Sequence, residues 1–93
     1  MEVPVKKRIA VLVRDRQAEA LRMAVGLTLA DDEVAVFVMD NKLDDDEKVN
    51  LNIETLRDLG VRICSNNPEN RLEYVTTVDI ARTLVTFDTV IPY

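Results

Sequence analysis

The chain contains a single cysteine, Cys64, in the segment "GVRICSNN" (60–67). A cysteine side chain acts as a nucleophile only as the thiolate, which forms when positive charge or a helix N-terminus lies nearby. Arg14, Arg16 and Arg71 are the side chains that could supply that charge. A cysteine at the end of a short apolar run is more often an inert, buried strand residue. Cys64 is therefore a candidate catalytic thiol, with a structural role as the alternative.

Polar residues follow each of the first three apolar runs that are predicted to form strands. In open parallel sheets, ligands bind beyond the carboxyl ends of the strands, so these residues would meet at one rim beside Cys64. The predicted binding residues at this rim are Arg14, Asp15, Arg16, Asp40, Asn41, Ser65, Asn66 and Asn67.

Other kinds of site are excluded by the residue types that the chain lacks. It has no histidine, which excludes a Ser-His-Asp triad and a metal site built on imidazole. It has only two glycines, too few for a P-loop or a dinucleotide-binding fingerprint. No hydrolase, oxidoreductase or kinase motif is present, and we expect no cofactor and no metal.

The acidic segment "NKLDDDEKVN" (41–50) contains clustered carboxylates, which can bind hard cations. It lacks the glycine and the final glutamate of an EF-hand loop. We therefore predict a solvated loop in which Asp44 and Glu47 form a capping pair for the second helix.

A phospho-receiver domain is another interpretation of the acidic residues. It would need a carboxylate at the end of a central strand, beside an acidic pair. Asp40 has the first position, and only Asp15 is placed for the second. Asp31 and Asp32 precede a strand, at the opposite end of the sheet, and no lysine ends the last strand. The sequence supports this interpretation least.

Length and composition predict one small domain over 1–93 with an aliphatic core, since 47% of the 93 residues are hydrophobic and none is tryptophan. The net charge of -5 argues against nucleic-acid binding. A lone cysteine cannot form an internal disulfide, and no segment resembles a signal peptide or a membrane span. We expect a cytoplasmic protein with no membrane partner. Because so small a core is marginal, we also expect a homo-oligomer.

Hydrophobic periodicity predicts four strands that alternate with three helices. The strands are expected at 8–14, 33–40, 61–64 and 89–93, and the helices at 18–30, 52–60 and 76–87. Asp15 would cap the first helix, and Gly60 would end the second. The third helix would turn one apolar face to the core, made of Val78, Ala81, Leu84 and Val85.

This alternation predicts right-handed βαβ units, a parallel sheet and a three-layer α/β/α architecture. The first two strands are apolar on both faces and should be central. The third alternates around Arg62 and the fourth contains Pro92, so both should be edges. The strand order 3-2-1-4 satisfies these constraints, with 2-1-3-4 as the alternative. It would leave the third helix alone on one face, which another subunit or the segment 66–76 would shield.

The order of these segments resembles the DsrE/DsrF-like proteins of sulfur relay. "KRIAVLVR", followed by an aliphatic helix and "DEVAVFVMDN", is similar to the opening unit of that family. "NIETLRDLGVRICSNN" is similar to its segment in which a cysteine ends the third strand, and "VTTVDIARTLVTFDTVIPY" to its closing helix and strand. The resemblance covers most of the chain and implies a DsrE-like α/β domain.

Some members of that family carry sulfur as a persulfide on the cysteine and assemble as oligomers. The resemblance implies that Cys64 carries sulfur in a homo-oligomer, with a sulfur donor or acceptor protein as partner. A thiolate can take up this sulfur without a base or a metal. Ile63 and Ser65 replace the Ala and Gly that often flank the cysteine in active members. The alternative is a non-catalytic oligomeric interaction or small-ligand-binding module of the same fold, in which Cys64 is structural.

Overall fold

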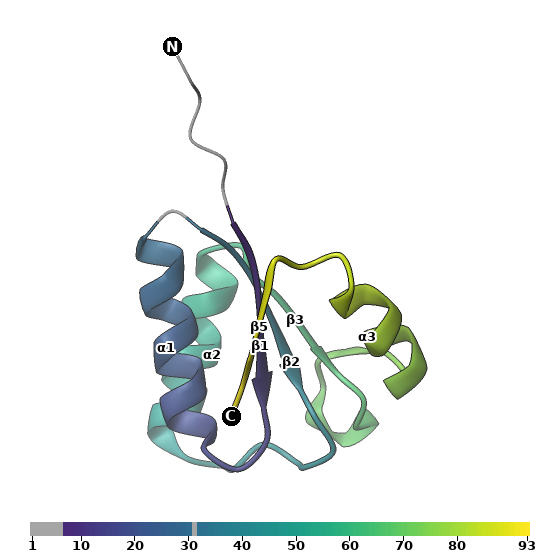
Figure 1. The fold of residues 1–93 in the computed structure, drawn as a ribbon. Coiled ribbons are helices and arrows are strands. Elements are labelled where there is room, and N and C mark those ends of the chain that lie inside the picture. Colours follow the sequence, from purple (N-terminus) through teal and green to yellow (C-terminus); the bar gives the residue numbers. More distant parts are fainter. Residues whose placement is uncertain (1–6, 31) are drawn as a thin grey trace.

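A computed structural model describes residues 7–30 and 32–93 and shows a parallel sheet between layers of helices (Figure 1). The strands are β1 (Arg8–Val13), β2 (Glu33–Val38), β3 (Arg62–Ser65), β4 (Glu73–Tyr74) and β5 (Thr89–Pro92). The helices are α1 (Gln17–Leu29), α2 (Glu47–Asp58) and α3 (Thr77–Leu84), and a 3-10 turn, η1, spans Pro68–Asn70. The predicted α/β/α architecture is confirmed.

The sheet has the order β4-β3-β2-β1-β5. The predicted order 3-2-1-4 is therefore confirmed for the four strands that periodicity identified. β1 and β2 are central and pair from Arg8 opposite Glu33 to Val13 opposite Val38. The prediction that β3 is an edge is wrong, because the two-residue β4 pairs with it. Since all strands run parallel, their carboxyl ends meet at one rim, which we call the carboxyl rim.

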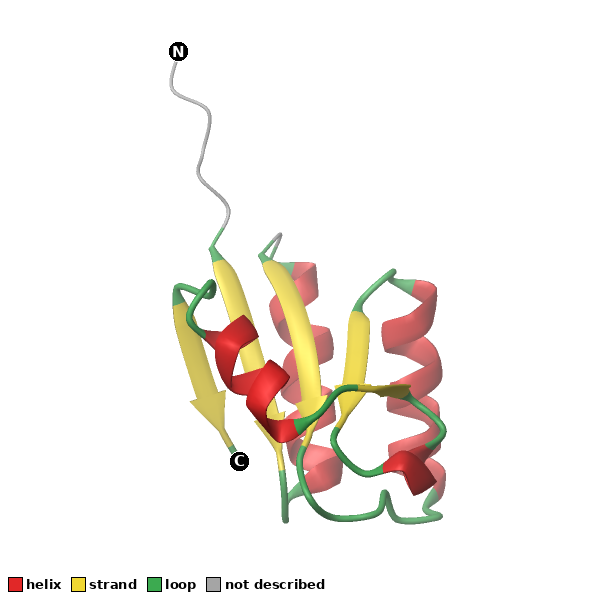
Figure 2. Ribbon diagram, turned by 90° about the vertical axis from the view of Figure 1, so that its right-hand side faces the viewer, coloured by secondary structure: helices red, strands yellow, loops and turns green. Residues whose placement is uncertain are grey.

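The helices cover the two faces of the sheet unequally (Figure 1; Figure 2). α1 and α2 pack together on one face, over the larger buried cluster, which includes Val11, Val36 and Leu56. α3 lies on the other face, which we call the second face, over a smaller cluster that includes Phe37 and Ile80. Right-handed crossovers predict this distribution, and the structure confirms it.

The segment 66–76 covers the second face only in part. Val75 packs against the smaller cluster, and β4 extends the sheet beside β3. Apolar side chains nevertheless remain exposed at Val78 of α3, at Val85, the C-cap of α3, and at Val90 of β5. The expectation that this segment shields the second face is therefore met only partly.

The buried side of α3 differs from the predicted one. Ile80 is 1% exposed and Leu84 is half-buried, whereas Val78 and Val85 are 60% and 83% exposed. At 100° per residue the apolar side chains of α3 form an arc of about 160°, from Ile80 to Val78. One helix on a sheet buries a narrower stripe, and the largest of these side chains, Ile80 and Leu84, lie at one end of the arc. The prediction that Leu84 faces inward is correct. The same prediction is wrong for Val78, Ala81 and Val85, which are exposed.

The start of α2 is set by a cap rather than by apolar periodicity. The Asp46 side chain accepts hydrogen bonds from the backbone N–H groups of Lys48 and Val49, at 2.8 and 3.3 Å. These bonds satisfy donors that the first turn of a helix leaves free. The helix therefore begins at Glu47, before the predicted start at residue 52, and the predicted Asp44–Glu47 capping pair is wrong.

Two further predictions concern helix ends. Arg16, not Asp15, occupies the N-cap of α1, and no side chain there accepts a capping hydrogen bond. The prediction for Asp15 is therefore wrong. Gly60 follows α2 with a φ of 77°, a left-handed conformation that glycine adopts without steric cost. That prediction is confirmed.

Candidate functional site

Cys64 lies inside the sheet. It is in β3, opposite Phe37 of β2 and Glu73 of β4, and its side chain is 0% exposed. It belongs to the smaller buried cluster, with Ala10 and Ile80. The Cys64 thiol thus packs in this cluster as a small apolar side chain.

The charged neighbours of the Cys64 thiol are Arg62 and Glu73. Arg62 is on the same face of β3, because side chains on a strand alternate. Its Nε and Nη2 donate to the two carboxylate oxygens of Glu73, at 2.9 and 2.7 Å. The Cys64 Sγ donates to Glu73 Oε1 at 3.5 Å. One carboxylate thus accepts hydrogen bonds from both side chains.

These surroundings keep the thiol protonated. Burial raises the pKa of Cys64 to about 11, with the Glu73 carboxylate adding to the rise and the Arg62 guanidinium opposing it. The hydrogen bonds from Arg62 hold the pKa of Glu73 below its ordinary value. At neutral pH, Cys64 is a neutral thiol that donates to a carboxylate. A cysteine nucleophile needs the reverse, a thiolate near positive charge.

The arginines that were expected to supply positive charge are exposed at the ends of β1 and η1: Arg14, Arg16 and Arg71. The pKa of Cys64 responds instead to Arg62 and Glu73. Sequence analysis missed this pair because only β4 brings Glu73 beside Cys64. A strand of two residues is too short to give a periodic signal.

Asp40 and Asn66 tie the loop after β2 to the loop after β3. Asn66 Oδ1 accepts from the backbone N–H of Asp40 at 2.6 Å, and Asn66 Nδ2 donates to Asp40 Oδ1 at 2.9 Å. Asn66 Nδ2 also donates to Thr77 Oγ1 at 2.9 Å, at the start of α3. Asp40 has a φ of 66°, which aspartate tolerates. The Asp40 carboxylate thus accepts a hydrogen bond from the Asn66 amide. Asp31, which the receiver interpretation also considered, lies outside the described residues.

Asn41 ties the loop after β2 to the loop after β1. Its Nδ2 lies 3.3 Å from both the backbone oxygen of Arg14 and Oδ1 of Asp15, and donates to them. Arg16 instead pairs with Glu19 within α1, at 3.9 Å. The carboxyl rim therefore brings together most of the predicted binding residues, as the parallel sheet requires.

Ser65 holds Asn67 and is itself held by a further residue, Asn70, that sequence analysis did not single out. The Ser65 hydroxyl accepts from the Asn67 backbone N–H at 3.0 Å and from Asn70 Nδ2 at 2.9 Å. Asn70 Oδ1 accepts from the Leu43 backbone N–H at 2.7 Å. Asn70 belongs to "NNPEN", whose composition predicts a turn but does not indicate which amide braces it.

Gln17 is a second residue that the sequence did not indicate. It is buried at the start of α1, its Nε2 donates to the backbone oxygen of Lys42 at 3.1 Å, and its Oε1 accepts from the Asp44 backbone N–H at 2.8 Å. Within the described ranges, no buried side-chain nitrogen or oxygen lacks a hydrogen-bond partner. The polar groups of the rim thus largely satisfy one another.

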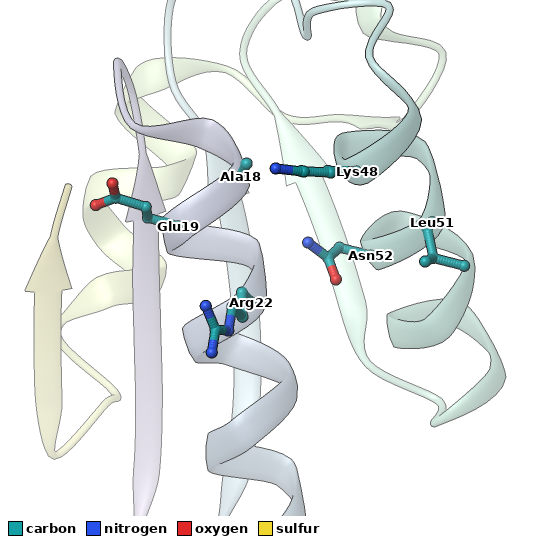
Figure 3. Close-up of a pocket in the computed structure, with 6 residues that line it drawn as sticks. All are labelled: Ala18, Glu19, Arg22, Lys48, Leu51 and Asn52. Atoms are coloured by element: carbon teal, nitrogen blue, oxygen red, sulfur yellow. The ribbon is translucent and has the colours of Figure 1, made fainter.

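Three pockets lie beside α2, and Cys64 lines none of them. The smallest, about 300 Å³, is lined by Ala18, Glu19, Arg22, Lys48, Leu51 and Asn52. Figure 3 shows Lys48 directed from α2 toward Ala18 of α1, whereas Glu19 and Leu51 point away from the gap. The largest, about 500 Å³, lies between α2, the loop after β2, and the chain that follows η1. The third, about 340 Å³, lies where α1 and α2 begin.

Comparison of the chain with protein-family models, with curated proteins and with solved structures found no match. Among residues 7–30 and 32–93, no three cysteine or acidic side chains come together as a metal site would require. In the same part of the chain, no helix is long and apolar enough to cross a membrane. The function is therefore inferred from the geometry of Cys64, the rim and the exposed surfaces.

Proposed function

We propose that this chain is a non-catalytic interaction module in which Cys64 is structural. The observation that carries the proposal is the closed environment of the thiol, which is 0% exposed and donates to Glu73. A thiol whose pKa is raised to about 11 by burial is almost entirely in the unreactive form at pH 7.

The exposed apolar side chains of the second face support an interaction role. Val78 and Val85 on α3 and Val90 on β5 all stand in solvent, although burial of such a side chain contributes about 1.5–3 kcal/mol. Val78 and Val85 are seven residues apart and so lie on the same side of the helix, and apolar side chains that cluster on a surface are typical of contacts with other proteins. A second copy of the chain is the partner that the small core favours, because association would add buried area that this domain lacks.

The alkylation rate of Cys64 tests its structural role. The native protein should react with iodoacetamide at pH 7 at least about 100-fold more slowly than the chain unfolded in urea. A rise in the pKa from 9.0 to about 11 alone lowers the thiolate fraction by that factor. Cys64→Ser should retain the fold and the oligomeric state. A native rate equal to that of the unfolded chain would contradict the proposal.

Sedimentation equilibrium tests the interaction surface. The wild-type chain should associate as its concentration rises, and Val85→Lys should shift it toward the monomer by placing a charge on the exposed side of α3. Leu51→Lys is the matched control, because Leu51 is also exposed but lies on α2. Equal effects of the two substitutions would show that α3 does not form the contact.

A persulfide carrier is the second candidate, and the small size of β4 favours it. β4 has only two residues, both exposed, so a displacement of 73–74 together with α3 would uncover the Cys64 Sγ. Glu73 would leave with β4, whereas Arg62 would remain on β3 and lower the pKa of the thiol. The thiolate would attack the outer sulfur of a donor persulfide. A new S–S bond forms on Cys64 as the donor cysteine leaves as a thiolate.

Mass spectrometry of the intact protein tests this candidate. Incubation with a cysteine desulfurase and cysteine should add the mass of one sulfur atom to the wild-type chain and none to Cys64→Ser. The added sulfur should be lost on treatment with a reducing thiol. A wild-type mass that does not change would remove the carrier function and leave the interaction module.

A further inference from the structure

The largest pocket beside α2 is independent of both the Cys64 thiol and the exposed side of α3. Its volume of about 500 Å³ is within the range of about 300–1,000 Å³ that small-ligand sites occupy. Three partly buried or buried apolar side chains form part of its lining: Leu43, Ile53 and Leu72. Each belongs to, or packs against, the larger buried cluster, so the pocket rests on the rigid core of the domain.

The side of the pocket formed by α2 is one stripe of that helix. Asn50, Ile53 and Arg57 recur at the spacing that places side chains on the same face of a helix. From Asn50 to Arg57 the helix rises by about 10 Å. The pocket is therefore elongated along α2, from the carboxyl rim, where the helix begins, toward its last turn.

The charges that line the pocket are separated along its length. At the rim end lie Lys42, Asp44 and Asp45, in the loop after β2, and Glu69, in η1. Farther from the rim lies Arg57, in the last turn of α2. Arg71 is between Asn70, which is fixed at the rim, and Leu72, which packs on the core. The rim end thus has an excess of negative charge, Arg57 gives the far end a positive charge, and Arg71 enters the pocket between the two ends.

The two arginines are available for a ligand. Neither Arg57 nor Arg71 forms an ion pair with a described residue. Arg71 has a left-handed φ of 53°, and it directly follows Asn70, whose side chain bonds to Ser65, Asn41 and the Leu43 backbone. The chain that presents Arg71 is therefore held in place before any ligand arrives, which lowers the entropic cost of binding.

We propose that this pocket binds a short peptide with free termini, about three residues long, with its carboxylate at Arg57 and Arg71 and its ammonium group at the acidic rim end. Guanidinium groups bind carboxylates with paired hydrogen bonds, and the rim carboxylates attract an ammonium group. An extended tripeptide spans about 10 Å, which matches the length of the α2 stripe. Its side chains would contact Leu43, Ile53 and Leu72. This inference goes beyond the proposed interaction function and does not depend on it.

The test is a ¹⁵N–¹H NMR titration of the full chain with the tripeptide Ala-Leu-Ala. Saturable shifts are expected at the amides of 42–45, 50–57 and 69–72. Acetylation of the amino terminus and amidation of the carboxyl terminus should each weaken binding about tenfold, the effect of losing one partly desolvated ion pair. Equal affinity of either capped peptide and the free tripeptide would overturn the proposal.

Two variants assign the carboxylate end. Arg57→Gln and Arg71→Gln should each weaken binding of the free tripeptide several-fold and leave binding of its amide unchanged. Arg22→Gln is the control, since Arg22 lines the smallest pocket beside α2 instead (Figure 3). Because all three arginines are exposed, each variant should keep the fold. A spectrum like that of the wild-type chain checks this for each variant. No saturable shifts in the millimolar range, or shifts confined to the residues around Arg22, would overturn the proposal. They would leave the association test of Val85→Lys unaffected.

Discussion

At the scale of single residues, burial raises the pKa of Cys64 most, and the Glu73 side chain adds to that rise. Its carboxylate accepts the thiol hydrogen bond at 3.5 Å and also binds both nitrogens that Arg62 directs toward it. Its charge and its hydrogen bond raise the pKa of Cys64, whereas the Arg62 guanidinium that it binds lowers that pKa. A change of this one side chain therefore tests the whole cluster.

Glu73→Gln should lower the pKa of Cys64 below about 11, because it removes a negative charge and releases Arg62 from its ion pair. The pKa is measured as the midpoint of the alkylation rate against pH. Glu69→Gln is the control, since it removes the same charge from η1, which does not contribute to the pKa of Cys64. A midpoint that is unchanged in Glu73→Gln would contradict the role assigned to this carboxylate.

The raised pKa of Cys64 also predicts a pH dependence of stability. Below pH 9 the thiol is protonated in the folded and the unfolded chain, so its contribution to stability is fully present. Above pH 9 the unfolded chain ionises first, and the contribution is lost as the pH rises through the folded pKa of about 11. The total loss is about 2 to 3 kcal/mol.

Urea unfolding at pH 8 and pH 11 measures this loss. The free energy of unfolding of the wild-type chain should fall more between these pH values than that of Cys64→Ser, whose hydroxyl does not ionise. Groups that titrate in both proteins cancel in the comparison. Parallel pH profiles would mean that the folded chain admits the thiolate as readily as the unfolded chain does.

The location of Cys64 was predictable, but its surroundings were not. The apolar run before it and the polar residues after it indicate a strand that ends at the carboxyl rim, and the structure places it there. Its burial depends on two elements that follow it in the chain: β4 pairs with β3, and α3 packs over the cluster that contains Cys64. Both depend on contacts between distant parts of the chain. No local pattern around Cys64 reports those contacts, so Arg62 and Glu73 were not recognised as its partners.

At the scale of elements, strands were predicted more accurately than helix ends. β1 and β2 are continuous apolar runs because both of their faces are buried, and such runs are visible in the sequence. The first turn of α2 is polar and depends on Asp46, which two other aspartates precede in the sequence. Composition cannot distinguish among three adjacent aspartates, whereas backbone geometry selects one of them.

A pair of substitutions tests that selection. Asp46→Ala should lower the free energy of unfolding by about 1 kcal/mol, because two backbone N–H groups lose their acceptor. Asp44→Ala should change it by less than about 0.5 kcal/mol, since the hydrogen bond of Asp44 to Gln17 uses its backbone N–H. Urea unfolding at neutral pH measures both values. A larger loss of unfolding free energy in Asp44→Ala than in Asp46→Ala would mean that Asp44, as the sequence predicted, caps α2.

At the scale of the whole molecule, the two faces of the sheet contribute unequally to stability. The larger buried cluster joins α1, α2, β1, β2 and β3, whereas α3 adds only Ile80 to the buried residues of the smaller cluster. Local opening costs less where fewer apolar contacts are broken. The side of the domain that carries α3 should therefore open at a lower free energy than the side that carries α1 and α2.

Native-state hydrogen exchange followed by mass spectrometry measures this difference. Amides of α3 should exchange through a partial opening well before those of α1, β1 and β2, which should exchange only on global unfolding. If α3 forms the contact between copies, a rise in protein concentration should slow exchange in 77–84 and leave exchange in α2 unchanged. Val85→Lys should abolish that concentration dependence. Equal protection of α3 and α2 in the dilute wild-type chain would contradict the unequal layers. If protection of α3 does not depend on protein concentration, then α3 is weakly packed but does not form the contact between copies.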